Sequence, residues 1–320
     1  MKHDFMWATL VHLSTNMWFE EGNTRGGCAK TWRRPASPVL RLDRKVWDEH
    51  ILQLKESGVN TIILDVGDGI VYQSHPEIAV EGAWTREMLL AELSRLDELG
   101  FEVIPKLNFS TTHDTWLGEY AKMVSTSVYY QVCKDLIDEV CELFHPRFLH
   151  LGMDEEVYEN QKDYDYVVIR QEDLWWKDFY YLVDCVEQNG VRAMMWSDYA
   201  RHRPDEFVEK CPKSVVQCVW YYFREFEEPL EPLYECRVRP FEIMEKHGYD
   251  QLPCGSVEYF EDNLELLAKY CVNKISKEHL LGFAQTTWAA VEPEWVEMLQ
   301  QSADTVKAVR EWYENRDAEA

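Results

Sequence analysis

Three consecutive carboxylates, Asp154, Glu155 and Glu156, end a stretch that opens as a short apolar run at Phe148. A buried ionised carboxylate is costly unless it is paired or takes part in chemistry. Neighbouring carboxyl groups raise each other's proton affinity, so one of them can stay protonated near neutral pH and act as a general acid. Acids at a strand end are otherwise solvated loop residues or helix caps. Their place after an apolar strand favours the catalytic interpretation for Asp154 and Glu155.

Segments with strand and helix character alternate along the whole chain. Strands are predicted at 5–11, 59–64, 101–107, 148–153, 191–196, 214–220, 249–254 and 280–286. Helices are predicted at 44–57, 86–99, 128–144, 174–188, 205–210, 240–247, 262–272 and 294–313. Strands that alternate with helices indicate parallel pairing with helical crossovers.

The loops differ in length according to their direction. Joints from helix to strand are mostly short, and four of them carry a glycine, at Gly58, Gly100, Gly190 and Gly248. Most loops from strand to helix are long. This asymmetry predicts a single (β/α)8 TIM barrel of the α/β class over residues 1–313, with a polar tail at 314–320. A doubly wound sheet is the alternative, but no G-x-G-x-x-G or G-x-x-x-x-G-K sequence is present.

In a barrel, the residues just after the strands meet in one pocket. Here they are carboxylates, aromatic side chains, an amide and imidazoles, with no lysine. Such a lining suits a polyhydroxylated neutral ligand, because aromatic faces pack on sugar C–H groups and carboxylates accept hydroxyl protons. The predicted binding residues are His12, Asp65, Asn108, His113, Trp196, Asp198, Trp220, Tyr259, Trp288 and Glu292.

Charge and composition narrow the class of partner. The 320 residues are 46% hydrophobic and 13% aromatic, which is enough for a large core. Acidic residues outnumber basic ones 58 to 33, and a net charge of -25 repels nucleic acid and anionic membranes. No apolar stretch reaches the 18 or so residues that a membrane span needs. A small-molecule or oligosaccharide substrate is therefore the expected partner.

The cysteines and the N-terminus favour a cytoplasmic protein. Nine cysteines without a C-x-x-C pair are expected to be mostly buried free thiols in a reducing compartment. The N-terminus lacks the pattern of a signal peptide. A secreted protein whose signal had been removed would look the same.

Other chemistries have weaker support. His12, His113 and His150 with nearby aspartates could bind zinc, but H-x-H and H-E-x-x-H are both absent. The G-x-S-x-G sequence of serine hydrolases is absent too. We expect no metal and no cofactor.

Several of these segments resemble one known family. The sequence His150-Leu151-Gly152-Met153-Asp154-Glu155 resembles the H-x-G-G-D-E signature of glycoside hydrolase family 20, the β-N-acetylhexosaminidases. The resemblance extends over nearly the whole chain as the catalytic barrel alone. The other similar segments are 74–77, 82–85, 100–105, the loop histidine His113, Met195-Trp196, and Thr287-Trp288 with Glu292.

The resemblance implies a retaining mechanism in which the substrate's own 2-acetamido oxygen attacks the anomeric carbon. Glu155 would protonate the leaving oxygen and then activate water. Asp154 would hold the acetamido N–H and stabilise the oxazolinium-like intermediate. The same resemblance implies an acetamido pocket walled by indole rings, with a tyrosine hydrogen-bonded to the acetamido oxygen. The corresponding residues are Trp196, Trp220, Trp288 and Tyr259.

The chain departs from the family in places that bear on sugar specificity. The family's arginine at the end of the first strand has no counterpart at residues 12–16, and the next arginines are Arg25 and Arg33. Met153 replaces the second glycine of the signature. Lys106 and Asn108 stand where the family tends to have acids.

Two other functions stay open. One is a barrel that binds sugar without cleaving it. The other is a glycosidase for a sugar without the acetamido group, which needs a separate nucleophile about 5 Å from the acid. Asp198 and Asp65 are the candidates for that nucleophile.

Overall fold

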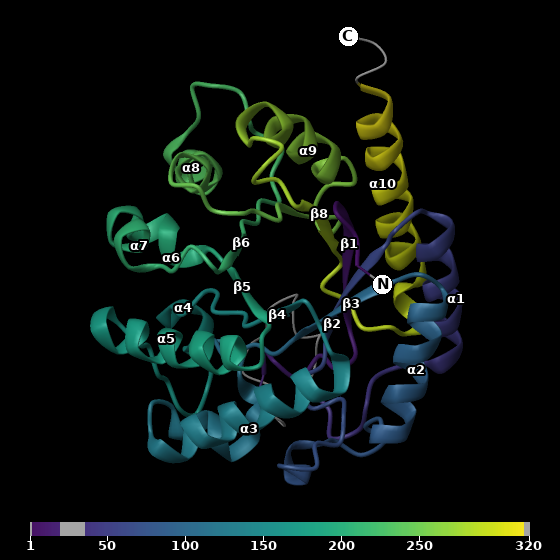
Figure 1. Ribbon diagram of the computed structural model, residues 1–320, viewed down its shortest axis with the longest axis vertical. Coiled ribbons are helices and arrows are strands. Elements are labelled where there is room, and N and C mark those ends of the chain that lie inside the picture. The colour runs from purple at the N-terminus through teal and green to yellow at the C-terminus, as the bar shows by residue number, and fades with distance from the viewer. Residues whose placement is uncertain (1, 20–35, 317–320) are drawn as a thin grey trace.

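The computed structural model describes residues 2–19 and 36–316, and its centre is a sheet of eight parallel strands surrounded by helices (Figure 1). The strands are β1 (Met6–His12), β2 (Thr61–Asp65), β3 (Glu102–Lys106), β4 (Phe148–His150), β5 (Arg192–Trp196), β6 (Val216–Cys218), β7 (Cys254–Ser256) and β8 (Gly282–Thr286). Their order is β6-β5-β4-β3-β2-β1-β8-β7. Parallel bridges from Gln217 to Gln251 and from Trp220 to Cys254 join the two ends of the sheet. The predicted (β/α)8 barrel is confirmed.

Helices follow the strands and form the outer layer (Figure 1). They are α1 (Arg44–Glu56), α2 (Arg86–Glu98), α3 (Ser127–Phe144), α4 (Tyr158–Gln161), α5 (Glu172–Gln188), α6 (Asp198–His202), α7 (Pro204–Lys210), α8 (Pro232–Lys246), α9 (Asn263–Lys274) and α10 (Val296–Asn315), with 3-10 turns η1 (Pro76–Ile78), η2 (Thr115–Met123) and η3 (Pro293–Trp295). Asp43, Thr85 and Thr126 cap three of these helices by accepting a backbone N–H of the first turn.

Alternate strand residues contribute to two separate parts of the core. Ile63 and Leu10 point into the barrel, where they pack with Ile104 and Met194. Ile62, the neighbour of Ile63, points outward to the layer between sheet and helices. Burial on both faces explains why the strands are apolar along most of their length.

The structure corrects two predicted elements. The helix expected at 240–247 is the longer α8, which starts at Pro232, a residue suited to the first helical position. The strand expected at 249–254 lies further along the chain as β7, because Pro253 has no N–H for the ladder. The last helix ends at Asn315, two residues into the expected tail, and residues 317–320 lie outside the described part.

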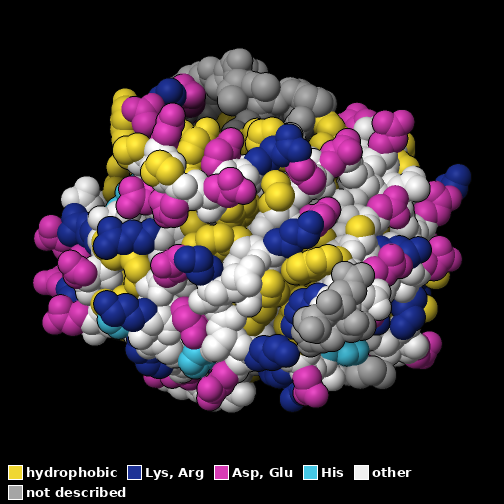
Figure 2. All heavy atoms as spheres, turned by 90° about the horizontal axis from the view of Figure 1, so that it is seen from above, with side chains coloured by type: hydrophobic (Ala, Val, Ile, Leu, Met, Phe, Trp, Pro, Cys, Tyr) yellow, Lys and Arg dark blue, Asp and Glu magenta, His cyan; other side chains and the backbone are white. Residues whose placement is uncertain are grey.

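The surface carries the acidic excess of the sequence. Acidic side chains are spread over the face in Figure 2, with basic and hydrophobic side chains between them. Within the described ranges, none of the helices has the length and apolar character to cross a membrane. The eight described cysteines are free thiols, and all except Cys236 are buried. Cys28, Arg25 and Arg33 lie outside the described residues.

Candidate active site

A cavity of about 820 Å³ opens at the C-terminal ends of the strands. Its volume lies in the range of pockets that enclose a drug-sized ligand. Asp154 and Glu155 line this cavity together with five of the predicted binding residues, His113, Trp196, Trp220, Tyr259 and Trp288. The structure thus brings the predicted acid pair and most of the predicted aromatic residues together.

The carboxylate of Asp154 is held by the loop that follows β3. Asn108 donates its side-chain N–H to Asp154 Oδ1 at 2.9 Å, and His113 Nδ1 lies 3.3 Å from the same oxygen. Burial alone raises the pKa of Asp154, but His113, Lys106 and Asn108 outweigh burial and hold the pKa well below its usual range. Asp154 is therefore an anion at every pH at which the protein is expected to work.

His113 shares its two ring nitrogens between the acid pair. Its Nε2 lies 3.9 Å from Glu155 Oε2. Burial alone lowers the pKa of His113, but the carboxylates of Asp154 and then Glu155 outweigh burial and raise the pKa above its usual value. A protonated His113 balances the charge of Asp154.

Glu155 differs from Asp154 in exposure. Its side chain is 35% exposed and faces the cavity, and its Oε2 accepts a hydrogen bond from Asn160 at 3.2 Å. The pair therefore consists of one fixed anion in the floor and one carboxyl group that can reach a ligand.

The backbone that carries the pair has an unusual conformation. Gly152, Met153 and Glu155 have φ values of 74°, 72° and 56°, in the left-handed region that residues other than glycine rarely adopt. A Cβ atom at Gly152 would lie 1.9 Å from Asn108 Oδ1. Glycine is therefore required there for the close approach of Asn108, the residue that holds Asp154.

Hydroxyl groups from residues 110–112 hold this turn. Ser110 Oγ donates to the carbonyl oxygen of Asp154, and Thr112 Oγ1 donates to that of Glu155. The buried Gln161 donates in turn to Thr112 Oγ1 at 3.2 Å. These bonds to main-chain oxygens fix the direction in which the two carboxyl groups leave the strand.

His12 and Asp65 lie within the barrel and do not line the cavity, contrary to the prediction. Lys106 Nζ donates to Asp65 Oδ2 at 2.5 Å, and His12 Nδ1 lies 3.3 Å from the same oxygen. All three side chains are buried. Lys106 and Asp65 form a buried ion pair, so neither side chain is available to a ligand.

The walls of the inner cavity are aromatic. Trp196 is buried in the floor, and its ring centroid lies 6.0 Å from that of Trp288. Trp288 Nε1 donates to the hydroxyl of Tyr222 at 3.2 Å, and the Tyr222 ring lies 4.9 Å from that of Trp220. These four rings form a deep compartment next to Asp154.

Asp198 stands behind this wall instead of lining it. It accepts the indole N–H of Trp220 at 2.8 Å, and the guanidinium of Arg201 lies 4.4 Å from the Trp220 ring centroid. Burial raises the pKa of Asp198 to about 7, and the charges of Asp154 and Glu155 add to this effect while Arg201 opposes it. Asp198 therefore positions Trp220.

Two further predicted residues lie away from the inner cavity. Glu292 does not line the cavity, and Arg41 binds both of its carboxylate oxygens, through Nε at 3.0 Å and through Nη2. Tyr259 lies at the mouth and is 57% exposed.

Sequence reasoning missed part of the lining. Trp18, Tyr222, Phe223, Tyr234 and Arg237 line the cavity and come from the loop after β1 and the segment between β6 and the middle of α8. Tyr222 could have been found from its place two residues after Trp220. Tyr234 and Arg237 had no such signal, because α8 was expected to start eight residues later.

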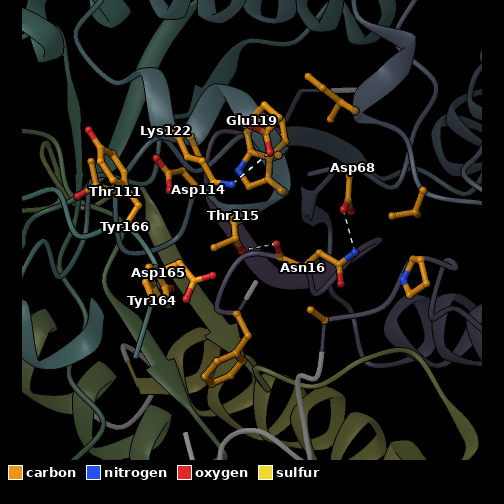
Figure 3. Close-up of a pocket in the computed structure, with 18 of the residues that line it drawn as sticks. Asn16, Asp68, Thr111, Asp114, Thr115, Glu119, Lys122, Tyr164, Asp165 and Tyr166 are labelled. Carbon is orange, nitrogen blue, oxygen red and sulfur yellow. Dashed lines mark hydrogen bonds and ion pairs between the residues drawn. The ribbon is translucent and has the colours of Figure 1, made fainter. Parts of the chain in front are cut away.

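A second, smaller cavity of about 410 Å³ adjoins the first (Figure 3). Phe19 and Tyr164 line both cavities. Its side chains are mainly polar, and Figure 3 shows Asn16 next to Asp68 and Lys122 paired with Glu119. It lacks the acid pair, so the larger cavity is the candidate active site.

One cluster in the described ranges has the donor atoms for a metal ion. His113, Asp154 and Glu155 each offer a ligand atom, and these atoms lie within 4.8 Å of one another. Imidazole and carboxylate suit zinc. The same three groups also pair with each other, because His113 lies 3.3 Å from Asp154 and 3.9 Å from Glu155.

Comparisons with known proteins establish the fold but not the family of this chain. The sequence matches no protein-family model and no curated relative. Solved structures of low sequence identity do match. The family-20 β-N-acetylhexosaminidase of Streptomyces coelicolor A3(2) is 12% identical, with a TM-score of 0.62 over 94% of this chain and 64% of the other. The Flavobacterium johnsoniae chitobiase is 17% identical, with a TM-score of 0.60 over 83% of this chain and 46% of the other.

A third structure gives the same picture. The β-N-acetylhexosaminidase of Bacteroides fragilis NCTC 9343 is 14% identical, with a TM-score of 0.59 over 98% of this chain and 71% of the other. The chain therefore spans less than two thirds of the first two proteins. At this level of identity the likeness establishes that the chain shares the barrel of the family-20 enzymes.

Proposed function

We propose that the protein is an exo-acting retaining glycosidase that removes terminal β-linked N-acetylhexosamine by substrate-assisted catalysis. The observation that carries the proposal is the contrast within the acid pair. Asp154 is a buried anion held by three neighbours, while Glu155 faces a compartment of indole rings. A fixed anion beside a reachable acid is the combination that this reaction needs.

Each residue then has one task. The acetamido oxygen of the substrate attacks the anomeric carbon while Glu155 protonates the departing glycosidic oxygen. Asp154 accepts the acetamido N–H and stabilises the positive charge of the oxazolinium intermediate. Glu155 next takes a proton from the water that opens this intermediate, which releases the sugar with its original anomeric configuration.

The aromatic compartment accommodates the acetamido group. Trp196, Trp220 and Trp288 supply apolar walls for its methyl group. Tyr222 lies deeper than Tyr259, so its hydroxyl is the better donor to the acetamido oxygen. The buried floor limits entry to the end of a chain, which supports exo action. A Streptomyces plicatus hexosaminidase, 12% identical at a TM-score of 0.61, was solved with its product, N-acetylglucosamine.

The alternative glycosidase, for a sugar without the acetamido group, has less support. Its candidate nucleophiles do not line the cavity: Asp65 is bound by Lys106, and Asp198 stands behind Trp220. A barrel that only binds sugar needs no acid at position 155, and the hydroxyl bonds that hold Glu155 argue against such a role.

Hydrolysis of two nitrophenyl substrates by wild type and Glu155→Gln tests the proposal. The N-acetyl-β-glucosaminide is expected to be cleaved and the plain β-glucoside is not, and Glu155→Gln is expected to lose at least 100-fold in kcat. Cleavage of the plain glucoside would require a nucleophile from the protein. Absence of cleavage of gluco- and galacto-configured acetamido substrates alike would favour the sugar-binding barrel.

A further inference from the structure

The candidate cavity is larger than one sugar, and its two regions differ in burial. The inner region holds Asp154, Trp196 and Tyr222, which are all buried. The outer region holds Phe223 and Tyr234, which are half-buried. A volume of about 820 Å³ suits a ligand of two sugar units, since pockets of this size enclose drug-sized molecules.

The outer region is built by the first half of α8 and the loop before it. The rings of Phe223 and Tyr234 meet edge to face with centroids 5.4 Å apart. Buried Asn263 donates to the carbonyl oxygen of Phe223 at 2.8 Å and so anchors the loop. The result is a fixed aromatic surface at the mouth, of the kind that packs on a sugar ring.

Arg237 adds unused hydrogen-bonding capacity to this surface. Its Nη1 donates to the carbonyl oxygen of Leu233 at 2.9 Å, which holds the guanidinium against the Phe223 ring, 5.7 Å from the centroid. Its Nε is buried and has no partner among the described residues. Since a guanidinium carries five N–H donors, Arg237 can serve a ligand without giving up its own support.

The charges nearby decide which ligand fits. Glu225 and Glu258 line the same cavity as Arg237. Two carboxylates in a cavity with one guanidinium disfavour an anionic group such as a sulfate or a uronic acid. They favour a neutral sugar, whose hydroxyls can accept from Arg237 and donate to the carboxylates.

We infer that Phe223, Tyr234 and Arg237 form a second sugar-binding subsite, which holds the neutral sugar on the leaving-group side of the cleaved bond. The inference rests on the proposed function for the identity of the first sugar. In this inference, Tyr234 and Arg237 of α8 make the protein favour oligosaccharides over simple glycosides, because they bind the second sugar. Arg237 would bind the second sugar from α8, the helix after β6, and not from the end of β1, where the family's arginine is missing.

Calorimetric binding to the non-cleaving Glu155→Gln variant tests the subsite. The ligands are N-acetylglucosamine and its β-1,4-linked disaccharide. The disaccharide is expected to bind about tenfold more tightly than the monosaccharide. Adding Arg237→Ala should bring this ratio close to one. Adding Arg239→Ala, on an exposed residue of the same helix, should keep the ratio of the parent.

Three results would overturn the subsite: equal affinity of the parent for the two ligands, a ratio unchanged by Arg237→Ala, or a ratio lowered equally by Arg239→Ala. Hydrolysis by the wild type is measured separately. A protein that prefers the disaccharide through Arg237 but cleaves neither substrate would keep the subsite and refute the glycosidase.

Discussion

The hydroxyl of Thr112 donates a hydrogen bond to the backbone carbonyl oxygen of Glu155 at 2.7 Å. Glu155 has a φ of 56°, a conformation that costs a side-chain-bearing residue roughly 1–2 kcal/mol. The bond therefore helps to keep the proposed acid in a strained backbone position.

Thr112→Val removes this bond while preserving the shape of the side chain. We expect kcat to fall about tenfold with little change in KM, because a misdirected Glu155 impairs proton transfer more than binding. Thr112→Ser, which keeps the hydroxyl, should retain most of the activity. The matched control is Thr115→Val, three residues further along the segment after β3, whose hydroxyl donates to the carbonyl oxygen of Asn16 in the loop after β1. Equal activity of Thr112→Val and wild type would refute a positioning role.

Asp114 is a buried acid whose Oδ2 has no hydrogen-bond partner in the described structure. Burial raises the pKa of Asp114 to about 8 from 3.8, with Glu156 adding to the shift and Arg170 opposing it. A carboxyl group with a raised pKa in the folded state contributes stability at low pH that is lost as the pH rises towards 8.

Asp114→Asn removes this dependence. Relative to wild type, the variant should gain roughly 1 kcal/mol in free energy of unfolding per pH unit between pH 5 and 7.5. Urea unfolding at both pH values measures the difference. A stability difference that is the same at pH 5 and pH 7.5 would show that Asp114 is already ionised in the folded protein.

Lys106 and Asp65 form an ion pair without access to water. Lys106→Met leaves the carboxylate of Asp65 buried with only His12 beside it. We expect a loss of about 3 kcal/mol in free energy of unfolding. The double variant Lys106→Met/Asp65→Leu should recover most of this loss, because it removes both charges. No recovery in the double variant would mean that Lys106 stabilises the barrel through other contacts, such as its effect on Asp154.

The acid pair and His113 offer ligand atoms that zinc can bridge. Because the proposed reaction uses no metal, a chelator should leave the hydrolysis rate unchanged. Added zinc should inhibit competitively, because it would displace the proton of His113 and bind Glu155. His113→Gln should weaken the inhibition at least tenfold. Activity lost to the chelator and restored by zinc would contradict the metal-free mechanism.

The sequence was enough to predict the barrel and the central acid pair. Strand and helix periodicity and the unequal loop lengths depend on local sequence, and the eight predicted strands lie close to the observed ones apart from β7. The acid pair was recognisable because it ends a strand that is buried along its length.

The depth at which each side chain lies could not be predicted. Asp65 and Asn108 occupy similar positions at the ends of two neighbouring predicted strands. In the structure, Asp65 is buried in the barrel in an ion pair with Lys106, whereas Asn108 donates a hydrogen bond to Asp154. Glu292 is bound by Arg41, a residue far away in the sequence, and does not line the cavity. Pairings between residues far apart in sequence decide these outcomes, and a single sequence does not reveal them. The first half of α8, which carries Arg237, was not predicted as helix, because Pro232 and Pro240 are residues that usually interrupt one.

The central claim is that the substrate's acetamido oxygen is the nucleophile. The most direct measurement is the hydrolysis rate of nitrophenyl glycosides whose N-acetyl group carries zero, one, two or three fluorine atoms. Fluorine withdraws electrons from the amide oxygen, so the account predicts that kcat/KM falls steeply and steadily along the series. A rate that is independent of fluorination would contradict the account and would require a nucleophile from the protein.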